Sequence, residues 1–488
     1  MEPTGEASDA STTSLVDLGL QLNSVARWLP AIDCGRLAAV CCALRDVVQE
    51  DTPLWSAHLA DNFGMNKAVG PRLEQHTSPR RAYAAWAATH SPFDAGCLPF
   101  VERAAGAWAH VEAFLSEHLP EVAASLRPPA SAADVEALED EIGCALPPAL
   151  RVMYGFHDGQ ALRSDDAYDA LREAVATNHP PNPALKREVD AGRDSLMSGL
   201  FGGYQFYDHI VCSRMLPLAR IRKARAFINE VGMFHGAPPA GSCHLPFAAS
   251  VDFKKVFAVC MENGSIRVST NGDPVLAAPQ PEGSTDGALR WFEEFSTRLS
   301  QGWYGVDTFT LPGRRGSSTD HTARGLCLFA RVEAEGSPAE AAVTRGVRVR
   351  ASPLYVPEIS GRPDDPSSLF AYSVRFSLLG GEEQSATRVG RPPLASCQLL
   401  SRNWVIRDGD AQVVAVASGE GVIGMYPTLR PGEPEFVYQS CTMQAPNQLP
   451  GSMDGSFEFV EGTIRQPCGE RWEVACPRFE LRLPDFVF

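Results

Sequence analysis

Grouped positive charge is scarce in this sequence. The 488 residues include 43 Lys and Arg against 59 Asp and Glu, which gives a net charge of −16 at pH 7. Proteins that bind nucleic acids neutralise phosphates with clustered Lys and Arg, and pairs such as Arg80-Arg81 are too short to form such a cluster. The sequence therefore argues against a nucleic-acid partner.

Long apolar runs are also missing. No uninterrupted apolar stretch approaches the ~20 residues that a membrane-spanning helix needs, so we expect no membrane partner. Residues 1–13 are small, polar and acidic, which is typical of a disordered leader and unlike a secretory signal or a transit peptide.

Paired cysteine motifs are absent as well. The thirteen Cys are an odd number, they are scattered, and no two of them form a C-x-x-C motif. This usage fits thiols that serve as small core residues in a reducing compartment, so we expect the cytoplasm and/or the nucleus. It offers no framework for a metal site.

Recognisable catalytic motifs are not found. The sequence has no nucleophile elbow and no H-E-x-x-H motif, and no His follows His321. The pair His157-Asp158 lies in a stretch with turn composition, and we interpret it and Asp208-His209 as hydrogen-bonded turn residues. We therefore predict no catalytic residue and no cofactor.

One glycine-rich stretch, GEGVIG at Gly419–Gly424, matches the pattern G-x-G-x-x-G. A dinucleotide site needs these glycines between a strand and a helix, but strand-like residues precede them and Pro427 follows, which leaves no room for the helix. We interpret the stretch as a strand kink or a close backbone contact. Phosphate binding by backbone amides of the loop stays open as the alternative.

The stretch Asp33–Trp55 predicts one helix followed by another. Asp33 is expected to cap the first helix, because its carboxylate can accept hydrogen bonds from free N–H groups of the first turn. Thr52 and Pro53 end that helix and begin the next, and a further helix is expected upstream over 15–29. One face of the first helix carries an apolar stripe, made by Leu37, Val40, Cys41, Leu44, Val47 and Val48.

This pattern resembles the second half of an F-box, the helical module that docks on the Skp-type adaptor of cullin ubiquitin ligases. The resemblance implies an F-box-like module over residues 14–63 and bridging helices over 64–98, including an Ala-rich helix at Pro79–Thr89. An ordinary N-terminal helical subdomain is the alternative. The implied adaptor-binding residues are Leu37, Val40, Cys41, Leu44, Leu54 and Trp55.

Residues 99–300 predict an α/β domain. Helical patterns start at Val101, at the cap residue Ser131, at Pro147-Pro148 and at Asp286. The order LEDEIGCALPPALRVMY and HDGQ, followed by apolar strand-like stretches, resembles the SUKH family, the yeast Knr/Smi-like α/β domain. Residues 161–198 lack periodicity and are expected to form a surface insertion.

Residues 301–324 have linker composition, and the chain changes character from Gly325 onward. Short alternating segments separated by Gly, Pro, Asp and Ser predict an all-β domain over 325–488. The stretches YVPE, QLLSRNW, GEGVIGMYP and MDGSFEF resemble the ApaG family, which implies an immunoglobulin-like or fibronectin-like β-sandwich. Asn403 stands where the ApaG pattern usually has His. The candidate target or ligand surface is Glu358, Arg402, Asn403, Trp404, Gly419, Gly421 and Gly424.

The order of F-box, SUKH-like and ApaG-like modules resembles a small eukaryotic group of F-box proteins, including plant Skp-interacting proteins. The resemblance implies a non-catalytic substrate-recognition subunit of a Skp–cullin–F-box ubiquitin ligase. Its expected partners are a Skp-type adaptor, the cullin complex and a target protein that the sequence does not identify. The alternative is a ligand-sensing or protein-binding module without a role in a ligase.

Overall fold

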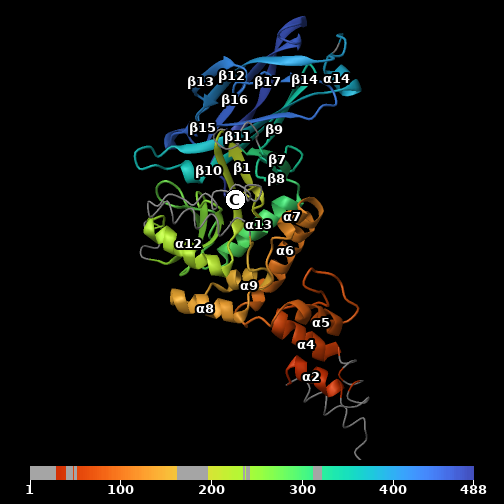
Figure 1. Ribbon diagram of the computed structural model, residues 1–488, viewed down its shortest axis with the longest axis vertical. Helices are drawn as coiled ribbons and strands as arrows, with labels where there is room; N and C mark the ends of the chain where they lie inside the picture. The colour runs from red at the N-terminus through yellow and green to blue at the C-terminus, as the bar shows by residue number, and fades with distance from the viewer. Residues whose placement is uncertain are drawn as a thin grey trace, which may run out of the picture. The chain divides into compact units, whose positions relative to one another are not determined.

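The computed structural model describes residues 29–39, 45, 48, 52–161, 196–234, 237, 242–311, 321–388 and 390–488 (Figure 1). The chain divides into two compact units, Met1–Ala109 and His110–Phe488. The expected upstream helix at 15–28, the stripe residues Val40, Cys41 and Leu44, and most of the expected insertion, at 162–195, lie outside the described residues.

The first unit contains helices α2 (Ala31–Ala38), α4 (Thr52–Phe63) and α5 (Pro79–Thr89) and the start of α6 (Leu98–His118). The helices at Thr52 and Pro79 begin where the sequence predicts them. The cap predicted at Asp33 is wrong, because α2 already begins at Ala31. Asp33 lies in its first turn instead, where its carboxylate pairs with Arg36 at 2.9 Å.

The second unit continues α6. Helices α7 (Pro120–Ala123), α8 (Ala132–Ile142) and α9 (Pro148–Phe156) come before its first sheet, and α12 (Leu218–Glu230) lies between strands of that sheet. Helix α8 has the ends that its sequence predicts. The Ser131 hydroxyl accepts a hydrogen bond from the Asp134 N–H, and Gly143 ends the helix with φ +77°. Helix α13 (Gly287–Ser300) follows the strands and buries the predicted stripe, which includes Phe292 and Phe295.

An eight-stranded sheet forms the centre of this region, in the order β6-β5-β4-β3-β2-β1-β8-β7. Neighbouring strands are antiparallel except β1 and β8, which are parallel. The strands are β1 (Gly203–Phe206), β2 (His209–Met215), β3 (His244–Ser250), β4 (Val256–Cys260), β5 (Ile266–Val268), β6 (Val275–Leu276), β7 (Gly305–Leu311) and β8 (His321–Cys327).

The linker predicted over 301–324 is therefore wrong in large part. Strands β7 and β8 occupy both sides of 312–320 and pair with each other from Gly305↔Cys327 to Leu311↔His321. Strand β8 then joins the central sheet through β1. The central region consequently extends past residue 300, to the end of β8.

The rest of the chain is a sandwich of two antiparallel sheets, drawn from cyan to dark blue in Figure 1. One sheet has the order β15-β11-β10-β9 and the other β13-β12-β16-β17, with β14 paired to β12. The all-β prediction is confirmed for this region. The strands are β9 (Glu340–Thr344), β10 (Val347–Val356), β11 (Ser368–Leu378), β12 (Cys397–Arg407), β13 (Val413–Glu420), β14 (Thr428–Leu429), β15 (Phe436–Gln444), β16 (Gly451–Gly462) and β17 (Pro467–Leu481).

Aromatic side chains fill the space between the two sheets. The ring of Phe376 on β11 lies 4.7 Å from that of Phe457 on β16, edge to face. Three short helical segments of the described chain lie between strands of the sandwich: η2 (Pro357–Ile359), α14 (Gly381–Thr387) and η3 (Pro446–Gln448). Across the described parts of both units, no helix combines the length and apolar character needed to cross a membrane.

Candidate functional site

The N-terminal module has its own small core, and two of the predicted adaptor-binding residues belong to it. Leu54 and Trp55 on α4 are 0% and 6% exposed, and they pack with Cys34 of α2 and with Val48. The Trp55 indole N–H donates to the Val48 carbonyl at 2.7 Å. Buried side chains offer little surface to a partner, so the structure assigns these two to holding the module together.

The remaining adaptor-binding residues stay a prediction. The backbone of Leu37 lies in α2, and Val40, Cys41 and Leu44 lie outside the described residues. A different apolar residue on α2, Ile32, was missed by sequence reasoning and is 68% exposed. Its signal in the sequence is a large apolar side chain directly before Asp33 that does not fit the spacing of the predicted apolar stripe.

A cysteine and a histidine meet inside this module without forming a catalytic pair. Cys34 Sγ lies 3.6 Å from His58 Nε2. Burial lowers the pKa of His58, and burial, assisted by the charge of Asp33, raises the pKa of the Cys34 thiol. A nucleophilic cysteine needs the opposite, a thiolate beside a cationic histidine. The pair is therefore suited to packing.

His157 and Asp158 are held in hydrogen bonds. His157 contacts the Arg127 carbonyl through Nδ1 at 2.7 Å and the Glu112 carboxylate through Nε2 at 2.8 Å. Asp158 accepts from the Leu218 N–H at 2.8 Å. The turn interpretation is wrong for His209, which begins strand β2. Within the described ranges, no group of three or more His, Cys, Asp or Glu side chains is placed to hold a metal ion.

The glycine-rich stretch forms a tight turn after β13. Gly421 has φ +58°, and a Cβ atom there would lie 2.6 Å from the Met425 carbonyl oxygen. The Arg402 guanidinium donates to the carbonyl oxygens of Glu420 and Gly421, at 3.2 and 2.8 Å. The turn thus directs carbonyl groups at a cation. This geometry agrees with the predicted strand kink and close contact.

The predicted surface at 402–404 is divided between the two faces of β12, because successive strand residues point in opposite directions. Asn403 is exposed and accepts from the Ser418 hydroxyl at 2.7 Å. Trp404 is 2% exposed, and its ring lies 5.3 Å from Tyr372 and 5.4 Å from Phe457. The placement of Trp404 on a target surface is therefore corrected: it is a core residue.

The outer edge of the same sheet is apolar and exposed. Strand β13 stands at the end of the sheet order and pairs with β12 along one side. Strand edges with free N–H and C=O groups accept further strands, and clustered exposed apolar side chains mark binding surfaces. We call the exposed apolar residues of β13 and the turn after it the β13 edge; they are Val413, Val414, Val416, Ile423, Met425 and Tyr426, between 38% and 61% exposed.

Glu358 was also predicted on a target surface, and the structure corrects this too. It lies in η2, is 7% exposed, and reaches the central region. Its Oε1 accepts from the Tyr204 hydroxyl at 2.6 Å and contacts His209 Nε2 at 2.8 Å. Glu358 therefore connects the sandwich with the central sheet.

The charge of this buried group is stabilised by its neighbours. Burial acts to raise the pKa of Glu358, but the hydrogen bond from His209, the charge of Lys255 and the hydrogen bond from Tyr204 together lower it. Lys255 is fully buried as well, and burial lowers its pKa to about 8, although Glu358 opposes the shift. Glu358 is thus an ionised carboxylate, and the Tyr204 hydroxyl lies between it and Lys255 Nζ.

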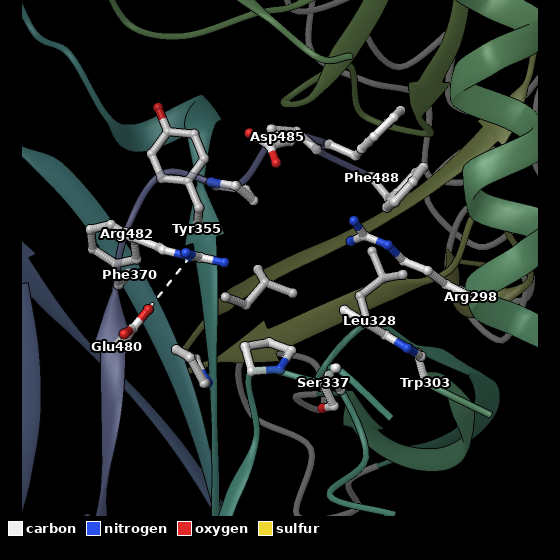
Figure 2. A pocket seen from close by; sticks show the side chains of 18 of the residues that line it. Arg298, Trp303, Leu328, Ser337, Tyr355, Phe370, Glu480, Arg482, Asp485 and Phe488 are labelled. Carbon is white, nitrogen blue, oxygen red and sulfur yellow. Dashed lines mark ion pairs between the residues drawn. The ribbon is translucent and has the colours of Figure 1, made fainter. Parts of the chain in front are cut away.

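A cavity of about 470 Å³ lies between the central region and the sandwich (Figure 2). The side chains of Arg298 and Arg482 both point into it, and Arg482 pairs with Glu480 at 3.6 Å. The Arg298 guanidinium lies 4.6 Å from the centre of the Trp303 ring. Volume and location are those of a ligand pocket at a domain junction. Further lining residues are Leu328, Tyr355, Phe370, Asp485 and Phe488.

Comparisons with known proteins cover nearly the whole chain. Residues 359–461 match the ApaG domain family, which confirms the predicted ApaG domain over that range. The chain is 30% identical over 468 residues to F-box protein SKIP16 of Arabidopsis thaliana, covering 93% of this chain and 94% of that protein.

Two further relatives are matched over smaller parts. Protein ApaG of Methylobacterium sp. (strain 4-46) is 36% identical over 144 residues, which cover 29% of this chain and 92% of that protein. F-box only protein 3 of Mus musculus is 24% identical over 382 residues, which cover 78% of this chain and 64% of that protein.

Proposed function

This chain belongs to the family of F-box proteins that includes SKIP16 of Arabidopsis thaliana, and from this premise we propose that it is the non-catalytic substrate-recognition subunit of a Skp–cullin–F-box ubiquitin ligase. The observation that carries the proposal is the extent of the match, 93% of this chain, together with the ApaG family match at residues 359–461. We propose the cytoplasm and/or the nucleus as its location, and a SUKH-like identity for the central region.

The N-terminal module is the proposed adaptor-binding part. Its core, built around Trp55 and Leu54, fixes the position of α2 relative to α4 within the module. In this proposal the adaptor contacts Ile32, which is 68% exposed, together with the predicted stripe residues Leu37, Val40, Cys41 and Leu44.

The β13 edge is the proposed target-binding part. It offers unpaired main-chain groups and six exposed apolar side chains on one strand and its turn. An extended target segment can add to such an edge as a further strand. The receptor then contributes to ubiquitin transfer by proximity, since it holds the target next to the charged conjugating enzyme and performs no chemistry itself.

The test is co-purification of the tagged full-length chain with a co-expressed Skp-type adaptor. The wild-type chain is expected to retain the adaptor, and the variant Ile32→Asp/Leu37→Asp/Leu44→Asp to lose it, because carboxylates in an apolar interface remain desolvated and unpaired. The matched control is Ile464→Asp, a change of the same kind at a 44% exposed position of the sandwich. The proposal is rejected if the adaptor is absent with the wild-type chain, or is retained equally by all three proteins.

The cavity of about 470 Å³ favours a second function, ligand binding without a ligase role. A chain of that kind is expected to ignore the adaptor and to melt at a higher temperature when a ligand fills the cavity. A thermal-shift panel of nucleotides and polyamines tests it. Lack of any shift removes the support for this function, and an Arg298→Ala variant controls for binding elsewhere.

A further inference from the structure

The last residues of the chain cross from the sandwich to the central region. After β17 ends at Leu481, the segment turns away from its sheet, and Val487 and Phe488 are 4% and 6% exposed. The Val487 N–H donates to the Ala277 carbonyl at 3.0 Å. The Val487 carbonyl accepts from the Trp291 indole N–H at 2.6 Å. Both main-chain groups of Val487 are thus bound by the central region.

Phe488 occupies an aromatic pocket of the same region. Its ring centre lies 5.3 Å from that of Trp291, 5.5 Å from Phe295 and 6.3 Å from Tyr304. The main-chain oxygen of Phe488 accepts a hydrogen bond from Lys255 Nζ. Lys255 has no exposed surface, so its ammonium group is buried where the segment ends. We call the site formed by Lys255, Ala277, Trp291, Phe295 and Tyr304 the aromatic groove.

This set of contacts is that of a peptide-binding site. Main-chain hydrogen bonds fix an extended segment, a pocket selects a side chain, and a buried donor binds the carbonyl group beyond it. All five groove residues come from the central region, so the site does not depend on the sandwich for its walls.

The cavity beside the segment adds room for a larger occupant. It is lined by Pro484 to Phe488 on one side, and Arg298 stands over the rings of Phe486 and Phe488 at 5.7 and 5.2 Å (Figure 2). Alternate aromatic residues, at 486 and 488, therefore face one cation, while Val487 between them makes the main-chain contacts.

We propose that the aromatic groove is a peptide-recognition site for an extended segment with aromatic residues at alternate positions. Residues 485–488 fill it from within the same chain, and a segment of a target protein with the same aromatic-x-aromatic chemistry competes for it. The assignment of the competitor to a target rests on the proposed receptor function. The groove itself rests on the contacts above.

Competition has a predictable size. A segment tethered by a short linker acts at an effective concentration of about 1 mM, so it masks the groove from any free peptide that binds with a weaker or similar constant. The apparent Kd of a free peptide equals its intrinsic Kd divided by the fraction of chains whose groove is open. For a segment whose intrinsic Kd is about 0.1 mM or lower, emptying the groove is therefore expected to tighten binding at least about tenfold.

The experiment measures fluorescence anisotropy of a labelled hexapeptide, Leu-Pro-Asp-Phe-Val-Phe, the sequence of residues 483–488. The full-length variant Phe486→Ala/Phe488→Ala is expected to bind it saturably and at least about tenfold more tightly than the wild-type chain. Addition of Trp291→Phe removes one donor to the peptide and is expected to weaken binding about fivefold. The control peptide Leu-Pro-Asp-Ala-Val-Ala is expected not to bind.

A second measurement uses the wild-type chain alone, in case the variants unfold. Saturating hexapeptide is expected to speed hydrogen exchange in residues 482–488, because the displaced segment loses its bond to Ala277. Absence of both saturable binding and faster exchange overturns the proposal, as does equal binding of the two peptides. Adaptor retention is read out separately, so loss of the groove and loss of the receptor function are distinguishable.

Discussion

At the scale of single residues, Glu358 makes the sharpest prediction. Its carboxylate accepts from the Tyr204 hydroxyl and contacts His209, and the charge of Lys255 lowers its pKa. The change Glu358→Ala removes the acceptor of both contacts from a buried position. Hydrogen bonds to a charged group typically contribute about 1.5–3 kcal/mol each. Urea unfolding of the purified chain is expected to show a loss of this size in the free energy of unfolding.

Glu480→Ala is the matched control for this change. Glu480 pairs with Arg482 at 3.6 Å, but the two side chains are 68% and 69% exposed. Exposed pairs contribute about 0–1 kcal/mol, so this variant is expected to unfold near the wild-type midpoint. Equal midpoints for Glu358→Ala and Glu480→Ala would show that Glu358 does not stabilise the contact between sandwich and central sheet.

The turn after β13 gives a second prediction at this scale. Gly421→Ala forces an alanine to φ +58° with its Cβ 2.6 Å from the Met425 carbonyl, and about 1–3 kcal/mol of destabilisation is expected. Gly424 has φ +77°, but a Cβ atom there would meet no other atom within 4 Å, so Gly424→Ala carries the cost of the left-handed backbone alone, about 1 kcal/mol. Thermal melts of both variants measure the difference. A larger loss for Gly424→Ala contradicts the close-contact interpretation.

The fate of the predicted site residues follows from the range of the interactions that bury them. The strand kink at Gly419–Gly424 was predictable, because it depends on neighbouring residues of the chain. The burial of Glu358 was not, because its partners Tyr204 and His209 are 154 and 149 positions away in the sequence. Trp404 is an intermediate case: strand alternation predicts that it faces the opposite side of the sheet from Asn403, but it does not predict which side is buried.

At the scale of secondary-structure elements, β13 makes a prediction for solution behaviour. Val416 is 61% exposed on the edge of its sheet, and lysine on an edge strand blocks the addition of another strand. The change Val416→Lys is expected to shift stability by no more than about 0.5 kcal/mol. The wild-type chain is expected to self-associate through this edge at high concentration, and Val416→Lys to reduce that self-association in light scattering.

Val343→Lys is the control that tests whether any added positive charge on the sandwich has the same effect as Val416→Lys. Val343 is 41% exposed on β9, which ends the other sheet of the sandwich. The added charge is the same, so an equal reduction in self-association by both variants would contradict a specific role for the β13 edge. Thermal melts of both variants verify that each is folded.

Prediction of elements worked where the signals are local. Helix α8 carries its own cap at Ser131 and its own end at Gly143, and both lie where the sequence places them. Strands β7 and β8 were missed because they flank a stretch of linker composition and are stabilised by pairing. Gly305 pairs with Cys327, and Cys327 then pairs with Gly203, more than a hundred residues earlier.

At the scale of the whole molecule, the ApaG domain was readable from the sequence, but the joining of the central region with the sandwich was not. Glu358 at the start of the ApaG domain and the segment ending at Phe488 both contribute to that joint, as do the contacts of Tyr207 with Ser440 and of Asp307 with Arg375. Glu358 and the segment ending at Phe488 converge on Lys255, which contacts the Tyr204 hydroxyl at 3.3 Å and the Phe488 main chain. A family resemblance predicts the fold of one module, and it does not predict the contacts between modules.

Buried thiols lower the stability of the folded chain at alkaline pH, in the same direction as the buried tyrosines Tyr154, Tyr204 and Tyr438, whose pKa values burial also raises. Burial raises the pKa of Cys212 and Cys397 from 9.0 to about 12, and raises those of Cys327 and Cys476 further. Above pH 9 the unfolded chain therefore releases protons that the folded chain keeps. Stability that is fully present below pH 9 is lost as the pH rises.

Lys255 acts in the opposite direction, because its folded pKa of about 8 lies below the usual 10.5. The contribution of Lys255 alone therefore increases the free energy of unfolding as the pH rises from about 8 to 10.5. Four thiols losing about 1.4 kcal/mol each outweigh a gain of about 2 kcal/mol, so a net loss of about 3 kcal/mol is expected between pH 8 and pH 10. Urea midpoints in a reducing buffer measure it. Cys212→Ala/Cys476→Ala is expected to halve the contribution of the thiols, and a midpoint that is equal or higher at pH 10 for the wild-type chain would contradict this account.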